Sequence, residues 1–503
     1  MIYYIGRLKK RLRMKKKLSL ILATAFALSA FAACEKDDPT VTQTRSGWLL
    51  SAPAYMDGTL SFNAYQTGMG LDLDPQNTVG EMQVITQTSR EGFETYLTKV
   101  KKNDYTEISR NEVNGNLFVE YEKDGNILYA YYTNAFKEAR VIEDSASVTE
   151  RAFEYDYTQK DGESTTIYQY ALMNDPYGNN NSSTPYADNG MLYIIHQANN
   201  KLILVDGGSA KQATDDKDGQ SGTVSGLLDF LYEITGKQAG EKIDVSAFIL
   251  THAHGDHKQF VHKLVQNHSD KFNIERAIYN VPYHANQTSF VPFGKLLKET
   301  YPNIQYLKPH TGQSIRLGEI TLDIMLTHED LVDGVSAITK ISNFNNTSTV
   351  IKYTINGKTF MQLADLSADE DGVEKILLGM YESGANEYVA LKSDIVQVAH
   401  HALQTGMEKT YKAIGASYAF VPQADCNFAT YKLEQRRCDI YQSTVNDVIA
   451  ANANVEFFFQ SRHTYGLKIA KDGTVNKTTP IAIKNANADY AALLDNVNAF
   501  GEE

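Results

Sequence analysis

Hydrophobic and polar positions divide the chain into segments of different character. Apolar residues recur at helical spacing over 90–102, which predicts one amphipathic helix. Two runs of alternating apolar and polar residues follow at 117–121 and 127–131, and the Asp-Gly pair between them is a strong signal for a β-hairpin. We therefore expect residues 47–145 to form a small α+β accessory domain, and we find no catalytic constellation in its sequence.

A second, larger body follows residues 146–190, a loop-rich linker that ends in a first strand. A helix is predicted over 224–235, because apolar residues fill one side and Gly236 follows as a stop signal. Strands interleaved with helices favour a layered α/β arrangement for residues 191–480. Strand-like runs occur at 191–197, 201–205, 245–250, 321–326, 349–355, 359–364 and 394–399. Residues 481–503 are left as a C-terminal tail.

The amino terminus has the pattern of an export signal. Residues 1–33 contain eight basic residues and no acidic ones, and they end in a mostly apolar run from Leu18 to Ala33. That run is shorter than the roughly 20 apolar residues of a membrane-spanning helix. A basic region, a short apolar core and small residues at the end describe a signal peptide instead. Met14 is an alternative start, since the residues from there onward make a complete signal.

The signal ends in Phe-Ala-Ala-Cys at residues 31–34, which resembles the lipobox of bacterial lipoproteins. The resemblance implies that Cys34 is lipidated and anchors the chain to a membrane; ordinary secretion is the alternative. The mostly acidic segment Glu-Lys-Asp-Asp at residues 35–38 is similar to the tag that sends some Gram-negative lipoproteins to the outer cell surface, or it is simply part of a solvated tether. We expect residues 34–46 to be a flexible tether. The expected location is the outer membrane, surface-exposed, with the periplasmic face as the alternative.

Charge and cysteine content narrow the classes of function. The chain has 48 Lys+Arg and 61 Asp+Glu residues, a formal net charge of −13. Without the eight basic residues of the signal, 40 basic residues face 61 acidic ones. Nucleic-acid binding needs a basic surface that displaces counterions from phosphates, so nucleic acid is disfavoured, and we expect a small-molecule or envelope-polymer substrate. Three cysteines exclude a disulfide scaffold, and the sequence leaves open whether Cys426 and Cys438 pair.

The densest group of metal-ligating residues follows the strand predicted at 245–250. His252 and His254 are two residues apart, so on an extended segment both imidazoles point to the same side and can bind one metal ion. The chain can turn sharply at the next residue, a glycine, after which Asp256 and His257 can hold a second ion. Neutral imidazole and carboxylate are good zinc ligands. Packing does not require such a cluster, and we therefore expect a metal site here.

The pattern His-x-His-x-Asp-His after a β-strand resembles the signature of the metallo-β-lactamase superfamily. The Val-Asp-Gly-Gly turn at Asp206 looks like that family's aspartate-glycine turn, which implies that Asp206 orients the metal-binding loop. Asp365 follows a strand where the family has an aspartate that bridges two metals, with Ala364 in place of the family's glycine. The resemblance implies an α/β fold, a four-layer αββα metallo-β-lactamase sandwich, preceded here by the small α+β accessory domain.

The pair His400-His401 resembles the strand-His-His-Gly segment of one branch of that superfamily, with Ala402 in place of the glycine. The branch includes the metal-dependent domain of late-competence (DNA-uptake) proteins and the phosphorylcholine esterases. Carried over, the resemblance implies two metal sites. The first would contain His252, His254, Asp365 and His400, and the second would contain Asp256, His257 and Asp365. His401 would support a ligand from behind or face the substrate, with a role as an additional ligand or acid as the alternative.

The remaining ligand of the second site stays open. The branch usually supplies a histidine shortly after the His-His pair, and residues 423–437 contain none. His463 is one candidate, either as a metal ligand or as an acid that protonates the leaving group. His310 and His328 are further candidates.

The resemblance implies a metal-dependent hydrolase with two zinc ions per chain, although other divalent metals also suit an imidazole-rich site. Zinc lowers the pKa of bound water to about 7, and Asp256 and His257 are the expected catalytic residues, with Asp256 steering the proton. The branch favours phosphoester substrates. Two alternatives are a hydrolase of lactones, lactams or thioesters, and a surface lipoprotein that binds a ligand on the same scaffold without turnover.

Overall fold

The computed structural model describes residues between 45 and 482. Residues 1–44 and 483–503 lie outside the described residues, and with them the predicted signal peptide, Cys34, almost all of the tether and most of the C-terminal tail. Within these bounds, the residues left out are 61–64, 69–78, 146–153, 173–189, 210–223, 283–290, 333–343, 369–371, 385–386, 405, 423–434 and 461–462. No helix in the described part of the chain has the length and apolar character needed to cross a bilayer.

The first sheet is antiparallel, with the strand order β15-β2-β3-β7-β6-β5-β4 and β1 beside β3. Its strands are β1 (Thr59–Leu60), β2 (Tyr65–Gly68), β3 (Val79–Thr86), β4 (Thr106–Val113), β5 (Asn116–Lys123), β6 (Asn126–Thr133), β7 (Glu138–Ser145) and β15 (Val281–Pro282). Between β5 and β6, Asp124 and Gly125 both have positive φ, 51° and 77°, as a tight hairpin turn requires. The predicted hairpin is therefore confirmed.

Helix α3 (Arg90–Lys102) covers one face of this sheet and confirms the helix predicted over the same residues. Ser89 caps its start, because the Gly92 N–H donates a hydrogen bond to the Ser89 hydroxyl at 3.0 Å. Apolar residues on its inner side, such as Phe93, share a core with Val119 and Leu128 of the sheet.

Two further sheets carry the rest of the chain. The second has the strand order β16-β14-β12-β11-β10-β9-β24-β25, with β13 beside β12 and β26 beside β24, and the third has the order β23-β22-β21-β20-β19-β18-β17-β8. The second sheet contains β9 (Ser164–Gln169), β10 (Tyr193–His196), β11 (Leu202–Val205), β12 (Ile243–Ile249), β13 (Phe272–Ile274), β14 (Arg276–Ile278), β16 (Gln305–Leu307), β24 (His463–Ala470), β25 (Val475–Lys477) and β26 (Ile481–Ala482). The third contains β8 (Tyr155–Asp156), β17 (Ser314–Gly318), β18 (Ile320–Leu326), β19 (Val350–Ile355), β20 (Lys358–Gln362), β21 (Ile395–Gln397), β22 (Tyr418–Val421) and β23 (Glu456–Phe459). The strands predicted between residues 191 and 399 are all present, within two residues at each end.

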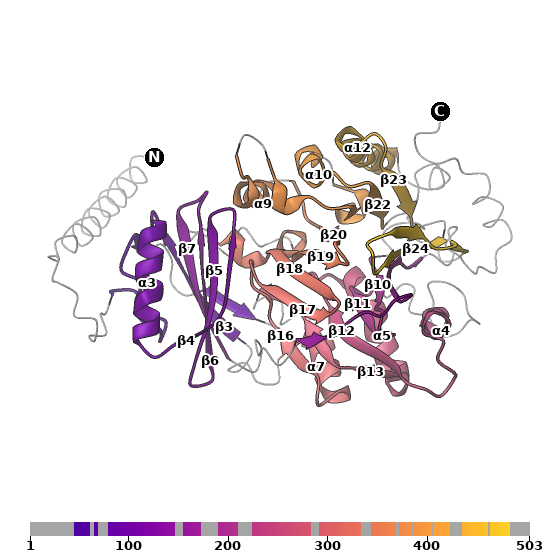
Figure 1. Ribbon diagram of the computed structural model, residues 1–503, viewed down its shortest axis with the longest axis horizontal. Coiled ribbons are helices and arrows are strands. Elements are labelled where there is room, and N and C mark those ends of the chain that lie inside the picture. The colour runs from indigo at the N-terminus through magenta and orange to yellow at the C-terminus, as the bar shows by residue number, and fades with distance from the viewer. Residues whose placement is uncertain are drawn as a thin grey trace, which may run out of the picture. The chain divides into compact units, whose positions relative to one another are not determined.

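The second and third sheets stack face to face, with helices on both outer faces. Their facing side chains form one apolar core, in which the ring of Tyr193 lies 5.6 Å from that of Phe360 and 5.8 Å from that of Phe420. One group of helices packs on the second sheet and another on the third, on opposite sides of the paired sheets (Figure 1). The first group is α4 (Val224–Thr235), α5 (Gln259–His268) and α7 (Val291–Thr300); the second is α9 (Val373–Tyr381), α10 (Glu408–Ile414) and α12 (Gln435–Ala451). The layers follow the order αββα, which is the order that the family resemblance implies.

The other face of the first sheet joins the core beneath α9. Phe118 and Tyr131 belong to the same apolar cluster as Leu331 and Leu377, and the side-chain amide of Asn116 donates a hydrogen bond to the Met380 carbonyl at 2.7 Å. The described part of residues 44–503 belongs to one compact unit. Whether residues 47–145 can fold by themselves as an accessory domain stays a prediction.

Candidate metal centre

The candidate metal ligands lie at strand ends along one edge of the stacked sheets. In the second sheet, β12 leads into loop 252–257, and Asp206 directly follows the parallel strand β11. In the third sheet, the parallel strands β20 and β21 lead to Asp365 and to the pair His400-His401. The carboxyl ends of parallel strands meet at one edge of a sheet, and the stacking brings the two edges together. Segments far apart in sequence therefore converge.

The first group of possible ligands consists of His252, His254 and Asp365. Nε2 of His252 lies 3.2 Å from Nδ1 of His254 and 3.6 Å from Oδ2 of Asp365, and one ligand atom from each of the three residues lies within 4.8 Å of the others. The spacing of two residues at the strand end thus places both imidazoles on one side, as the sequence predicts.

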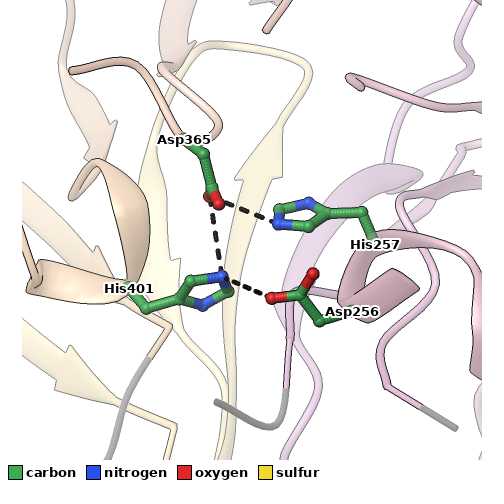
Figure 2. Close-up of side chains that lie close together, drawn as sticks. All are labelled: Asp256, His257, Asp365 and His401. Atoms are coloured by element: carbon green, nitrogen blue, oxygen red, sulfur yellow. Dashed lines mark ion pairs between the residues drawn. The ribbon is translucent and has the colours of Figure 1, made fainter. Parts of the chain in front are cut away.

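The second group consists of Asp256, His257, Asp365 and His401, which point toward one another from the two sheets (Figure 2). Oδ1 of Asp365 lies 3.3 Å from Nε2 of His257 and 3.6 Å from Nε2 of His401. Nε2 of His401 also lies 3.4 Å from Oδ2 of Asp256. Asp365 belongs to both groups and presents a different oxygen to each, which is the arrangement of a carboxylate that can bridge two ions.

Hydrogen bonds from groups outside the centre orient the rings of His257 and His401 and determine which nitrogen of each ring faces Asp365. Oδ2 of the buried Asp206 accepts a hydrogen bond from Nδ1 of His257 at 2.8 Å, and Oδ1 accepts from the backbone N–H of Thr251 at 2.9 Å. Nδ1 of His401 donates to the carbonyl of Pro422 at 3.1 Å. A carboxylate and a backbone carbonyl oxygen accept hydrogen bonds, so Nδ1 carries a proton in each ring and Nε2 faces Asp365.

An unusual backbone turn brings both His400 and His401 to the centre. Successive side chains of a strand point to opposite faces, but here His400, His401 and Ala402 have φ values of 49°, 52° and 57°. This left-handed region is uncommon for residues other than glycine. Ala364, before the shared aspartate, is also left-handed, with φ 51°. Ala364 and Ala402, which stand where the resemblance leads us to expect glycine in these two segments, are therefore both left-handed.

Burial and charge set the ionisation of these groups. Burial, together with the nearby His257, lowers the pKa of His252 well below its usual value, so this imidazole is neutral. Burial opposes the charged form of Asp365, but His257 and His401 hold the pKa of its carboxyl well below the usual range. Burial likewise opposes the charged form of His257, but Asp365 and Asp206 raise its pKa well above the usual value. The proton on His257 thus supplies positive charge that a bound cation would supply instead.

The residues present fit two divalent cations. Nε2 of His257 and Oδ1 of Asp365 are buried and 3.3 Å apart, and neither completes a hydrogen bond within the described residues. Buried polar atoms are rarely left in this state, and a cation between them would satisfy both. Imidazole and carboxylate ligands suit zinc, and they also accept manganese or iron. A buried histidine-aspartate cluster of this kind is suited to a metalloenzyme.

His400 lies beside the first group rather than within it. Its Nε2 is 3.9 Å from Oδ2 of Asp365 and 2.9 Å from the side-chain amide nitrogen of Asn345. Asn345 belongs to the short helix η8 (Phe344–Thr347), which precedes β19. No pattern in the sequence singles out this asparagine, although it stands in a polar run directly before a predicted strand.

The other histidine candidates lie apart from these two groups or outside the described side chains. His310 is buried between Asp144 and Glu329, with nitrogen–oxygen distances of 2.7 and 2.8 Å, and Nε2 of His328 lies 2.9 Å from Oδ1 of Asn280. Neither joins a described ligand group. His463 begins β24, but its side chain lies outside the described residues, as do Cys426 and the side chain of Cys438. The fourth member of the second group is His401, for which the sequence allows a role as an additional ligand or acid besides a place behind a ligand or facing the substrate.

Comparisons with known proteins add distant structural likenesses. No family model matches the chain, and no curated protein matches it. A mutant of the CmlA beta-hydroxylase shares 11% identity over 60% of this chain and 46% of its own, with a TM-score of 0.28. A diphosphatase of the PhnP family shares 12% identity over 63% of this chain and 99% of its own, with a TM-score of 0.27. Zinc-bound PqqB from Methylobacterium extorquens shares 8% identity over 46% and 71%, with a TM-score of 0.24. Likenesses at this level assign no activity to the chain.

Proposed function

We propose that this protein is a metal-dependent hydrolase of the metallo-β-lactamase superfamily that acts on phosphoesters at the cell envelope. The observation that carries the proposal is Asp365, whose two oxygens face two buried groups of ligands. The signature at residues 252–257 and the αββα layers support the superfamily. The histidine pair that follows the shared aspartate in the sequence supports the late-competence and phosphorylcholine-esterase branch, and with it a phosphoester bond.

Each residue has a role in this proposal. When bound, two zinc ions would lower the pKa of water and polarise an oxygen of the substrate. His252, His254 and Asp365 would hold one ion, with His400 beside them; Asp256, His257, Asp365 and His401 would hold the other. Asp206 keeps Nε2 of His257 aimed at Asp365.

Asp256 is the residue best placed to move a proton. Its carboxylate is more exposed than that of Asp365, 22% against 2% of the side chain. Burial opposes its ionisation, but His257 and His401 hold its pKa well below the usual range. It therefore stays an acceptor at neutral pH, at the more open side of the centre.

A chromogenic phosphodiester tests this function, with a lactone, a lactam and a thioester as competing substrates. We expect the phosphodiester to be hydrolysed, and we expect His252→Ala to abolish that activity. His262→Ala is the matched control, because His262 of helix α5 stacks on Phe293 of helix α7 and belongs to neither ligand group. Hydrolysis of only a carbonyl substrate would favour the alternative bond class, and tight glycan or lipid binding without turnover would favour a binding lipoprotein.

We also propose that Cys34 carries a lipid that holds the chain on the outer membrane, facing the surface. The support is the lipobox-like sequence and the acidic residues after it. Cys34→Ala is expected to move the protein from the membrane fraction to a soluble one. If the variant stays in the membrane fraction, the lipid anchor is wrong.

A further inference from the structure

His400 has one nitrogen for which two partners compete. Its Nε2 lies 2.9 Å from the amide nitrogen of Asn345 and 3.9 Å from the shared carboxylate of Asp365. A neutral imidazole has a single lone pair, which either accepts a hydrogen bond or coordinates a metal ion. Contact with Asn345 and coordination of the first metal through this nitrogen therefore exclude each other.

Asn345 is held in place by the packing of η8. The Ser348 N–H donates to the Asn345 carbonyl at 3.1 Å, and the Thr349 N–H donates to the Thr251 carbonyl at 2.9 Å, directly before the first ligand histidine. The ring of Phe344 lies 5.6 Å from that of His254. Asn345 itself is 8% exposed. The segment thus spans from one histidine of the first group to His400, and its amide is not a mobile surface group.

The second ligand group is arranged more completely for binding a metal ion than the first. The second group has four residues whose ligand atoms lie within 4.8 Å of one another, and the first has three, with His400 outside. In the second group, Nδ1 of His257 and of His401 is fixed by a hydrogen bond that leaves Nε2 facing the centre. In His400 it is Nε2 that carries the hydrogen bond to Asn345.

We propose that Asn345 is a positioning residue that competes with the first metal for His400 and thereby makes the first site the weaker and later-filled of the two. This inference deepens the proposed function and rests on it. Filling the first site requires His400 to exchange the Asn345 amide for the ion. The displaced amide then stays at the edge of the first site, where its N–H groups can donate to an oxygen of an anionic substrate.

Metal titration of the purified full chain, stripped of metal beforehand, tests the competition. Zinc affinities at both sites are measured by competition with a fluorescent chelator, and the ligand field of the weaker site is followed by Co²⁺ absorption. Asn345→Ala should tighten the weaker site about fivefold, the effect of removing one neutral hydrogen bond that metal binding must break. The tighter site should not change. Asn345→Ser is a second, polar variant with the same expectation, in case the alanine variant folds poorly.

Asn346→Ala is the matched control, because Oδ1 of Asn346 accepts a hydrogen bond from the Ser367 hydroxyl at 2.6 Å, whereas it is Asn345 whose amide contacts His400. It should leave the affinity of the weaker site unchanged. Unchanged affinities in both Asn345 variants, or an equal change at both sites, would overturn the competition while leaving the metal centre intact. A wild-type chain that binds no ions would overturn the metal centre itself and the competition with it.

Discussion

His401 and Asp256 lie 3.4 Å apart, measured from Nε2 to Oδ2, across the interface between the third sheet and the loop that follows β12. The Pro422 carbonyl holds the opposite nitrogen of the ring at 3.1 Å. This relationship joins the two sheets at their common edge and makes His401, rather than a histidine further along the chain, the fourth residue of the second ligand group.

Removal of His401 should therefore empty one metal site and leave the other. We expect His401→Ala to bind one zinc ion per chain where the wild type binds two, with a loss of affinity at the second site larger than the 10–100-fold typical of residues behind the ligands. Elemental analysis after dialysis against a weak chelator measures the difference. His400→Ala is the comparison, and it should weaken the other site. Two tightly bound ions in His401→Ala would contradict this assignment.

The contact between the first sheet and the sandwich can be tested at one glycine. Gly312 has φ 88°, and a Cβ added there would lie 2.1 Å from the ring of Phe118. Gly312→Ala should lower the free energy of unfolding by about 1–2 kcal/mol through the strain of a left-handed alanine and by a further roughly 1–3 kcal/mol through overpacking. Denaturant unfolding measures the free energy.

Gly357→Ala is the control for that experiment, because Gly357 has φ 78° but no described atom lies within 4 Å of the added Cβ. Both variants carry the backbone strain, so the difference between them isolates the contact with Phe118. Equal losses of stability in Gly312→Ala and Gly357→Ala would show that Phe118 of the first sheet does not pack against the turn at Gly312.

His310 should make stability depend on pH in the alkaline range. Burial opposes its charged form, but Glu329 and Asp144 raise its pKa to about 9, against about 6.5 in the unfolded chain. A raised pKa contributes stability that is complete below about pH 6.5 and is lost as pH rises through about 9. We expect unfolding free energy to fall by up to about 3 kcal/mol from this group over that window.

Denaturant unfolding at pH 6.5 and 9.5 measures that fall, and His310→Gln should reduce it. His262→Gln should keep the wild-type fall, because burial lowers the pKa of His262 and it stays neutral across the window. The same pH dependence in wild type and His310→Gln would show that the buried pairs do not hold the proton on His310.

Replacing the two alanines of left-handed conformation at the candidate metal centre, Ala364 and Ala402, with glycine should stabilise the folded chain. Ala364 and Ala402 have φ values of 51° and 57°, which cost an alanine about 1–2 kcal/mol and a glycine little. The greater freedom of glycine in the unfolded chain offsets part of the gain. Ala364→Gly and Ala402→Gly should each raise the unfolding free energy of the metal-free chain by up to about 1 kcal/mol. Ala413→Gly, inside helix α10, should lower it by a similar amount, and a loss in all three variants would contradict the strain.

The elements that the sequence predicted are those whose pattern is local. The helix over 90–102 has an apolar side and a capping serine, and in the loop 252–257 the spacing of the residues brings the candidate ligands His252 and His254 to one side. The role of His401 could not be predicted in this way, because neighbouring residues on a strand should face opposite sides. Only the left-handed turn at 400–402 brings both rings to Asp365. Asn345 is likewise a product of tertiary packing, since an asparagine before a strand has no distinctive pattern.

Metal content of the wild type and of Asp365→Ala tests the central claim most directly. The claim is that one carboxylate serves two ions, with Oδ2 facing His252 and Oδ1 facing His257 and His401. Elemental analysis should find two divalent ions per wild-type chain, and the single Asp365→Ala substitution should weaken both sites together. A wild type without bound metal, or an Asp365→Ala variant that keeps either site at wild-type affinity, would contradict the account.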